Sequence, residues 1–194
     1  AYFYNAMGVD VTFVEFLPNI VPVEDIDVSK QLEKTFKKKG ISIMTNSSVE
    51  KVNKLDKGCE VIVKTKKGEE SISCDIVLSA VGIQPNIENI GLEETGIIVD
   101  AGKIVINEFY ETNIPGYYAI GDVVAGQALA HVASAEGITC VEKIAGHNPE
   151  PIDYNNIPGC TYCSPEIASV GMTEKAAKEA GYELKVGKFP FSAS

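Results

Sequence analysis

Alternating and continuous runs of apolar residues along the chain predict a protein of the mixed α/β class. Strands are expected where apolar, β-branched and aromatic residues alternate with polar ones or follow one another directly. These segments are 9–14, 41–44, 49–55, 60–65, 70–74, 75–81, 104–107, 117–120, 167–170 and the stretch that begins at 182. Residues 75–81 form a continuous apolar run, which is typical of a parallel strand buried on both faces.

The clearest helix is predicted between the first two strands. Val28, Leu32 and Phe36 recur every four residues and share one face, and three lysines precede a stop at Gly40. Lysines near the end of a helix interact favourably with its dipole. The helix is therefore expected over 28–39.

A second helix is predicted over 128–145, a segment rich in small residues. Its expected packing side is formed by Ala130, Ala133, Gly137, Val141 and Ile144. Shorter helices are expected before Gly8 and between Thr173 and Gly181, because glycine commonly ends a helix. Residues 85–102 are rich in turn-forming residues and show no helical period.

Composition narrows the classes of function. The net charge of −10 argues against nucleic acid or an anionic membrane as a partner. No window approaches 18 consecutive apolar residues, so the pattern predicts no membrane-spanning helix. Five cysteines, an odd number without the spacing of a small disulfide scaffold, favour a cytoplasmic location, where thiols stay reduced.

Residues 112–122 form the most informative segment of the chain. Pro115 and Gly116 predict a turn, and 117–120 predicts a short buried strand that Gly121 ends. Asp122 then lies at the carboxyl edge of a strand, where ligands bind in α/β sheets. Because a carboxylate accepts hydrogen bonds from sugar or polyol hydroxyls, Asp122 is the first candidate binding residue.

This segment resembles the second flavin-binding motif of the pyridine nucleotide-disulfide oxidoreductases. Three other segments resemble motifs of the same family. They are a Gly-x-x-Pro-Asn strand exit at 82–86, a helix start with Leu-Ala-His and Glu-Gly at 129–137, and the entry to a dimerisation domain at 162–171. The resemblance extends over nearly all 194 residues.

The resemblance implies three domains and a redox activity. Residues 1–85 would form a Rossmann-like NAD-binding domain without its first strand, 86–151 part of an FAD-binding central domain, and 152–194 the start of an α+β dimerisation domain. A linker-like composition at 147–151 supports the last boundary. The whole homodimeric enzyme would pass electrons from a dithiol through a disulfide and FAD to NAD. Its partners would be lipoyl domains of 2-oxo acid dehydrogenase or glycine cleavage complexes.

Several elements of the family pattern have no counterpart in these 194 residues. They are the glycine-rich loops for FAD and for NAD, the Cys-x-x-x-x-Cys pair, and the C-terminal His-Glu pair. We therefore expect an internal fragment of a longer enzyme, inactive by itself, with no catalytic residue and no metal ligand of its own.

The resemblance implies that Glu15, Val49 and Gly82 contact NAD. An acid about 20 residues beyond the first fingerprint glycine binds the adenosine ribose, and a carboxylate there repels a 2′-phosphate. Since all 17 basic residues are lysines, NAD is favoured over NADP. Val49 matches the position that packs on adenine, and Gly82 a glycine near the nicotinamide. Each residue also fits a purely structural role: Glu15 as a solvated side chain at a strand end, Val49 as a core residue and Gly82 as a glycine at a strand exit.

The flavin contacts implied by the resemblance lie further along the chain. Asp122 would accept hydrogen bonds from the ribityl hydroxyls. The helix start at Ala128, Leu129, Ala130 and His131 would lie against the flavin ring, where the N–H groups of a helix N-terminus favour negative charge. His131 would act through its backbone position.

Cys160 and Cys163 form a Cys-x-x-Cys motif, which can be redox-active or half of a zinc site. Pro158, Gly159 and Tyr162 indicate a loop entering a strand, so we interpret the pair as structural.

Two alternatives to the main interpretation remain at this stage. The first is another FAD-dependent disulfide reductase, of the glutathione or mercuric reductase type. Such enzymes generally use NADPH, and basic residues would be expected after Glu15, where Phe16 and Leu17 stand. The second is a non-catalytic nucleotide-binding module.

Overall fold

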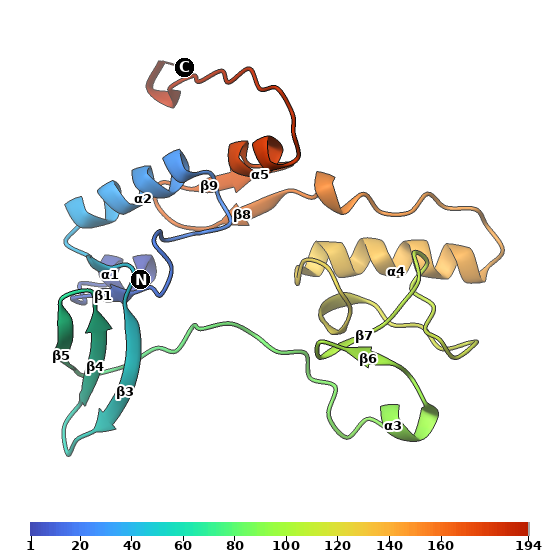
Figure 1. Cartoon of the computed structure of the whole chain (residues 1–194), viewed down its shortest axis with the longest axis horizontal. Helices are drawn as coiled ribbons and strands as arrows, with labels where there is room; N and C mark the ends of the chain where they lie inside the picture. Colours follow the sequence, from blue (N-terminus) through green and yellow to red (C-terminus); the bar gives the residue numbers. More distant parts are fainter. Residues whose placement is uncertain (194) are drawn as a thin grey trace. The chain divides into compact units, whose positions relative to one another are not determined.

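The computed structural model describes residues 1–193, and these form two compact units (Figure 1). Unit 1 combines Ala1–Ser79 with the segment that begins at Pro158, and unit 2 is the continuous stretch Ala80–Ile157. Within the described range, no helix has both the length and the apolar character needed to cross a membrane.

The first part of unit 1 is a parallel β-α-β arrangement. Strands β1 (Thr12–Val14) and β2 (Ser42–Met44) pair in parallel and are connected through helix α2 (Ile26–Lys38). A short helix α1 (Tyr2–Ala6) precedes them, and Gly8 follows it with a positive φ of 85°. The predicted α/β class, with a Rossmann-like crossover between parallel strands, is confirmed.

A three-stranded antiparallel sheet follows in the same unit. Its strands β3 (Ser48–Lys54), β4 (Cys59–Thr65) and β5 (Gly68–Cys74) are arranged in chain order, with β4 in the centre. Lys66 and Lys67 form the hairpin turn between the predicted strands β4 and β5. Val61 and Val63 of β4 are buried, which gives the sheet one apolar face.

The last segment of unit 1 packs on α2. Strands β8 (Gly159–Thr161) and β9 (Ile167–Ser169) form an antiparallel pair, and helix α5 (Glu174–Glu179) and a short 3₁₀ turn (Phe191–Ala193) follow. The shared core contains Ile20, Leu32, Phe36, Ile41, Cys163 and Ile167. Polar contacts join the same parts, since the Glu174 N–H donates to Asp25 Oδ1 at 2.8 Å. Helix α2 thus buries its predicted apolar face.

Unit 2 holds shorter elements around a small core of Leu92, Ile104 and Val124. They are helix α3 (Leu92–Thr95), strands β6 (Val99–Asp100) and β7 (Lys103–Ile104), 3₁₀ turn η1 (Gly121–Val123), helix α4 (Ala130–Ile144) and 3₁₀ turn η2 (Tyr154–Asn156). Helix α3 lies in the stretch for which the sequence showed no helical period. Its single turn is bounded by two glycines in the left-handed conformation, Gly91 and Gly96.

Several predicted strands were wrong. Residues 75–81 are extended but join no strand ladder, and Ile76 and Val81 are 82% and 95% exposed. The stretch from 182 is likewise unpaired, and 104–107 is reduced to the end of β7. An apolar run shows that a segment is suited to burial. A strand also needs the edge of a neighbouring strand to pair with, and the tertiary structure decides whether such an edge is present.

Residues 117–120 are not the buried strand that was expected. A single bridge pairs Glu111 with Tyr118, and Tyr117 is 49% exposed. The predicted turn is present, since Gly116 has a positive φ of 82° and the Tyr117 N–H donates to the Ile114 carbonyl at 3.1 Å. The segment is therefore one arm of a short hairpin and lacks a second neighbour.

The packing side predicted for α4 was correct only in part. Ala133 and Gly137 are partly buried, but Ala130, Val141 and Ile144 are exposed. The buried side chains belong to Val132, Glu136, Thr139 and Cys140. The prediction chose small apolar residues, whereas the buried face includes a carboxylate whose hydrogen bonds make its burial possible.

Candidate functional site

In unit 1, Glu15 lies at the carboxyl ends of the parallel strands. Its N–H donates to the Met44 carbonyl at 2.8 Å, and its own carbonyl accepts from the Ser47 N–H at 3.0 Å. These two bonds continue the β1–β2 pairing and fix the backbone of Glu15 against the chain that leaves β2. The side chain is held as well, because Oε1 accepts from the Leu17 N–H at 2.8 Å. A carboxylate is thus presented at the edge of the sheet where ligands bind in this type of fold.

A hollow of about 270 Å³ lies beside Glu15. It is lined by Ile43, Met44, Thr45, Asn46, Ser47, Thr65, Lys66, Lys67 and Glu70. Two of these, Met44 and Ser47, are the residues bonded to the Glu15 backbone. Val49 is the second residue of strand β3 and is 48% exposed. The structure therefore places this hollow next to the residues that bond the Glu15 backbone, although its lining includes neither Glu15 nor Val49.

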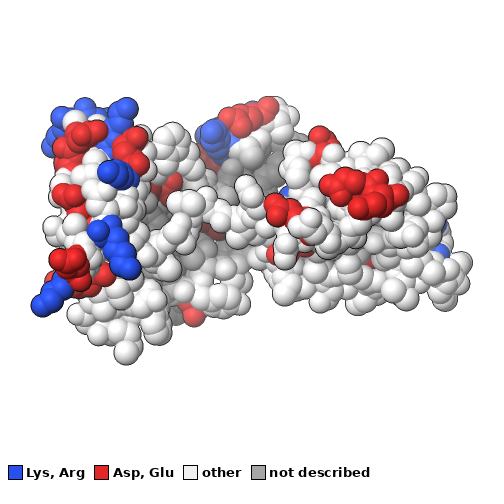
Figure 2. Space-filling model, turned by 90° about the horizontal axis from the view of Figure 1, so that it is seen from below, with Lys and Arg blue, Asp and Glu red and all other residues white. Residues whose placement is uncertain are grey.

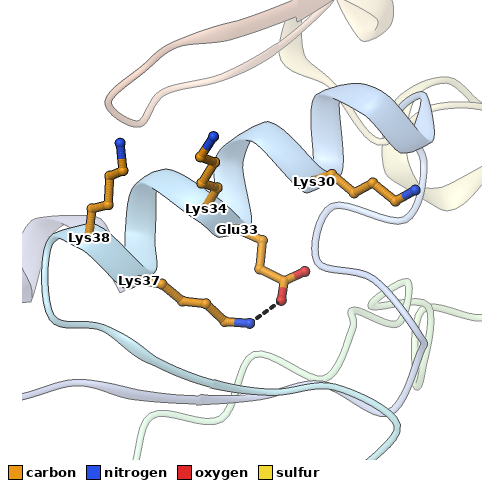
Figure 3. A pocket seen from close by; sticks show the side chains of 5 residues that line it. All are labelled: Lys30, Glu33, Lys34, Lys37 and Lys38. Carbon is orange, nitrogen blue, oxygen red and sulfur yellow. Dashed lines mark hydrogen bonds and ion pairs between the residues drawn. The ribbon is translucent and has the colours of Figure 1, made fainter.

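A second hollow runs along the exposed face of α2 (Figure 3). It is lined by Lys30, Glu33, Lys34, Lys37 and Lys38, all from the same helix. One ion pair joins Lys37 Nζ and Glu33 Oε1 at 2.5 Å, four residues apart. None of the predicted site residues lies here, and we interpret this hollow as the solvated face of an amphipathic helix.

In unit 2, Asp122 lies on the 3₁₀ turn η1 and is exposed. Gly121 before it has a φ of 76°, and a Cβ at this position would meet Ala133 Cβ at 3.3 Å. The turn therefore lies against the beginning of α4, whose N-cap is Leu129. Ala128, Ala130 and His131 are exposed at the same end of the helix. The structure brings Asp122 and the predicted helix start together.

A buried carboxylate holds this turn in place. Glu136 of α4 is 1% exposed, and its Oε2 accepts from the Gly121 N–H at 2.6 Å. Its Oε1 accepts from the Tyr154 hydroxyl at 2.6 Å, and that hydroxyl lies 3.2 Å from the Tyr110 hydroxyl. Burial, together with the hydrogen bond to Glu136, raises the pKa of Tyr154, and burial raises the pKa of Tyr110. The three groups therefore form one chain of hydrogen bonds next to the turn that carries Asp122, with Glu136 and Tyr110 buried and Tyr154 partly buried.

Sequence reasoning missed the role of Glu136. The residue stands in the Glu-Gly pair that carried part of the resemblance, and an acid flanked by small residues within this helix was a further signal. Its partner Tyr154 is 18 residues further along the chain and lies outside helix α4. No periodic spacing in the sequence therefore indicates that the two side chains are in contact. Only the packing of α4 on the turns η1 and η2 brings them together.

Gly82 lies outside the helices and strands of unit 2. Gly82 has a φ of 124° and is exposed in an extended segment, whereas the sequence placed it at a strand exit.

In the Cys-x-x-Cys motif, Cys160 is exposed on β8, but Cys163 is buried and its thiol donates to the Pro165 carbonyl at 3.0 Å. Burial raises the pKa of Cys163, which disfavours the reactive thiolate.

Comparison with known proteins identifies the family. Residues 1–137 match the pyridine nucleotide-disulphide oxidoreductase family, and residues 157–194 match the dimerisation domain of the same family. The chain belongs to the pyridine nucleotide-disulphide oxidoreductases. The family predicted from the sequence motifs is confirmed.

Several curated relatives share this stretch of the family fold. The chain is 48% identical to a dihydrolipoyl dehydrogenase of Rhizobium etli over 196 aligned residues, which cover all of the chain and 41% of the relative. It is 45% identical to one of Bacillus subtilis, covering 96% of the chain and 40% of the relative. It is 44% identical to a mitochondrial one of Canis lupus familiaris, covering 98% and 38%. The chain thus spans about two fifths of the length of these relatives.

Two solved structures have the same fold as this chain. LpdA from Mycobacterium tuberculosis superposes with a TM-score of 0.84 at 27% identity, over 92% of this chain and 39% of that protein. The HOCl-induced flavoprotein disulfide reductase RclA from Escherichia coli superposes with a TM-score of 0.88 at 24% identity, over 99% of this chain and 44% of that protein.

Proposed function

We propose that the chain is an internal part of a dihydrolipoyl dehydrogenase, an enzyme that oxidises dihydrolipoamide with NAD. The observation that supports this most strongly is 48% identity, across the whole chain, to an enzyme of that name. In this proposal residues 1–85 belong to the NAD-binding domain, 86–151 to the FAD-binding central domain and 152–194 to the dimerisation domain. The dimerisation-domain match supports a homodimer.

The geometry of unit 1 is compatible with the adenosine end of NAD. The Glu15 carboxylate lies at the strand ends with Oε1 held by Leu17, which orients Oε2 for a ribose hydroxyl. Val49 offers a half-exposed apolar surface for a planar base. The hollow near Glu15 is lined by residues 43–47 together with Thr65, Lys66, Lys67 and Glu70. We therefore include Glu15 and Val49 in the proposal as residues that contact the adenosine of NAD.

The geometry of unit 2 is compatible with the flavin. FAD, when bound, supplies the redox chemistry, and the protein orients it. Asp122 would accept hydrogen bonds from the ribityl hydroxyls, and the Glu136 carboxylate fixes the turn that carries it. The start of α4 at Ala128, Leu129, Ala130 and His131 would face the flavin ring, where its N–H groups favour negative charge. Gly82, with no side chain, would allow close approach of the nicotinamide.

Partners and location follow from the proposed activity. Dihydrolipoamide is carried on lipoyl domains, so the partners would be those of 2-oxo acid dehydrogenase or glycine cleavage complexes. A cytoplasmic location remains part of the proposal, supported by the thiol content of the chain.

Assay of the full-length protein tests the function. We expect a yellow protein that reduces NAD with dihydrolipoamide. Preference for NADPH together with glutathione disulfide or mercuric ion would support the related reductases and contradict the proposal. A colourless full-length protein with neither activity would indicate a nucleotide-binding module.

The choice of NAD over NADP is expected to depend on Glu15. In the full-length enzyme, Glu15→Gln combined with Phe16→Lys and Leu17→Arg should shift the ratio of kcat/KM values toward NADP. A shift of about tenfold or more is expected, because a repelling carboxylate is replaced by phosphate-binding cations. Phe16 is 74% exposed and Leu17 41%, so both positions can accommodate long polar side chains.

Two variants serve as controls for this exchange. The double variant Phe16→Lys with Leu17→Arg keeps the Glu15 carboxylate. Its comparison with the triple variant separates the attraction of the 2′-phosphate by the new cations from the loss of its repulsion by Glu15. Glu69→Gln removes an exposed carboxylate of β5 and should leave the ratio unchanged. An unchanged ratio in the triple variant would show that Glu15 does not contact the ribose.

A further inference from the structure

Two cysteines outside the motifs discussed above face each other across the antiparallel sheet of unit 1. Cys59 is the first residue of β4 and Cys74 is the last residue of β5, and the strand register makes them direct partners. Both are partly buried thiols. Their separation of 15 positions in the sequence gives no hint of this contact, because only the register of the hairpin defines it.

The geometry of such a pair matches the requirements of a disulfide. Directly opposed residues of an antiparallel pair have Cα atoms about 4.5–5.5 Å apart, and their side chains point to the same face. Disulfides span Cα separations of roughly 4.4–6.8 Å. Cys59 shares its face with Val61 and Val63, both buried. The two thiols therefore lie together at the partly exposed end of an apolar face.

The backbone around the two thiols is fixed. Strand β4 is the central strand, and Cys59 is paired with Lys54 of β3 on its other side. The preceding residue, Gly58, has a φ of 76°, and a Cβ there would lie 2.5 Å from the Cys74 carbonyl oxygen. Only glycine permits this close approach of the turn to the end of β5. Bringing the two sulfur atoms together therefore requires no displacement of the strands.

We propose that Cys59 and Cys74 form an intramolecular disulfide when the protein meets a hydroperoxide. One thiolate attacks the peroxide oxygen and becomes a sulfenic acid, and the O–O bond breaks to release water or an alcohol. The opposed thiolate then attacks that sulfur, forms the S–S bond and displaces hydroxide, which takes up a proton and leaves as water. Overall, two thiols lose two electrons and two protons to the peroxide. The proposal does not depend on the proposed function.

The remaining cysteines are less suited to this reaction. Cys163 is 8% exposed and its thiol donates to a backbone carbonyl. Cys140 is 6% exposed on α4, and burial raises the pKa of its thiol. Cys160 is exposed, but its neighbour in the motif is the buried Cys163. A low dose of peroxide should therefore act on the cross-strand pair first.

Peptide mapping of the oxidised chain tests the proposal. The 194-residue chain is treated with one equivalent of hydrogen peroxide, alkylated without reduction, digested and analysed by mass spectrometry. We expect free thiols to fall from five to three, with one linked peptide pair containing Cys59 and Cys74. Dithiothreitol should restore all five.

Single substitutions identify the partners. Cys59→Ser and Cys74→Ser should each abolish the linked peptides, whereas Cys160→Ser, the matched control, should leave their yield unchanged. A bridge between Cys160 and Cys163 in the wild-type chain would overturn the proposal. It would also be overturned by sulfinic acid accumulating on Cys59 or Cys74 without any bridge.

Discussion

Replacing Glu136 with alanine is expected to destabilise unit 2 by about 3 kcal/mol or more. The carboxylate accepts two hydrogen bonds, from the Gly121 N–H and the Tyr154 hydroxyl, and hydrogen bonds to charged groups contribute about 1.5–3 kcal/mol each. Alanine also leaves the Gly121 N–H without its acceptor and opens a cavity next to Tyr154. The change therefore removes the contacts that join α4 to the turns η1 and η2.

Denaturant unfolding of the wild-type and variant chains, monitored by tyrosine fluorescence, measures this loss. The matched control is Glu142→Ala on the exposed side of the same helix, which should change the free energy of unfolding by less than about 0.5 kcal/mol. Glu136→Gln should fall between the two. Its amide oxygen can accept from Gly121, and its amide nitrogen can donate to a Tyr154 hydroxyl turned toward Tyr110. Equal stability of Glu136→Ala and Glu142→Ala would contradict this account.

Replacing Asp122 with alanine is expected to weaken FAD retention in the full-length enzyme by about ten- to a hundredfold. The polyol hydroxyls would lose a charged acceptor, which is worth about 1.5–3 kcal/mol. Asp122 is exposed and its turn is held through the Gly121 backbone, so its removal should leave the fold of unit 2 intact. The effect should thus appear in cofactor binding and not in stability.

The measurement is the flavin-to-protein ratio after dialysis, followed by titration of the apoenzyme with FAD. Asp100→Ala, which removes an exposed carboxylate of β6 in the same unit, is the matched control. If Asp122→Ala keeps its flavin and its affinity, the residue does not contact the ribityl chain. Comparison with Glu136→Ala distinguishes the two roles, because that variant should lose stability as well as flavin.

The elements that the sequence predicted well are those with local signals at both ends. Helix α2 has an apolar stripe and a stop at Gly40, and it begins and ends within two residues of the prediction. Strands β4 and β5 are joined by a two-lysine turn, which also fixes their register. The turn at Pro115-Gly116 was also predicted correctly, whereas Asp122 was expected at the end of a buried strand and instead lies on a 3₁₀ turn.

The predictions that were wrong or missing concern features that depend on residues far apart in the sequence. Residues 75–81 have the composition of a buried strand, but composition cannot supply the neighbouring edge that a strand needs. The Glu136–Tyr154 contact and the Cys59–Cys74 pair likewise arise from packing and register. Local patterns thus predicted which residues could bind a ligand, while the groups that hold them in place became visible only in the structure.

The route of the chain through its two units sets an order for folding during synthesis. Unit 2 is a continuous stretch and can form once Ile157 has left the ribosome. Unit 1 must wait longer, because Asp25 at the start of α2 meets Glu174, 149 residues later in the sequence. At about 5–20 residues per second, translation of that interval lasts roughly 7–30 seconds. During this time the apolar face of α2, with Leu32 and Phe36, is without its final covering and is open to chaperones and to other nascent chains.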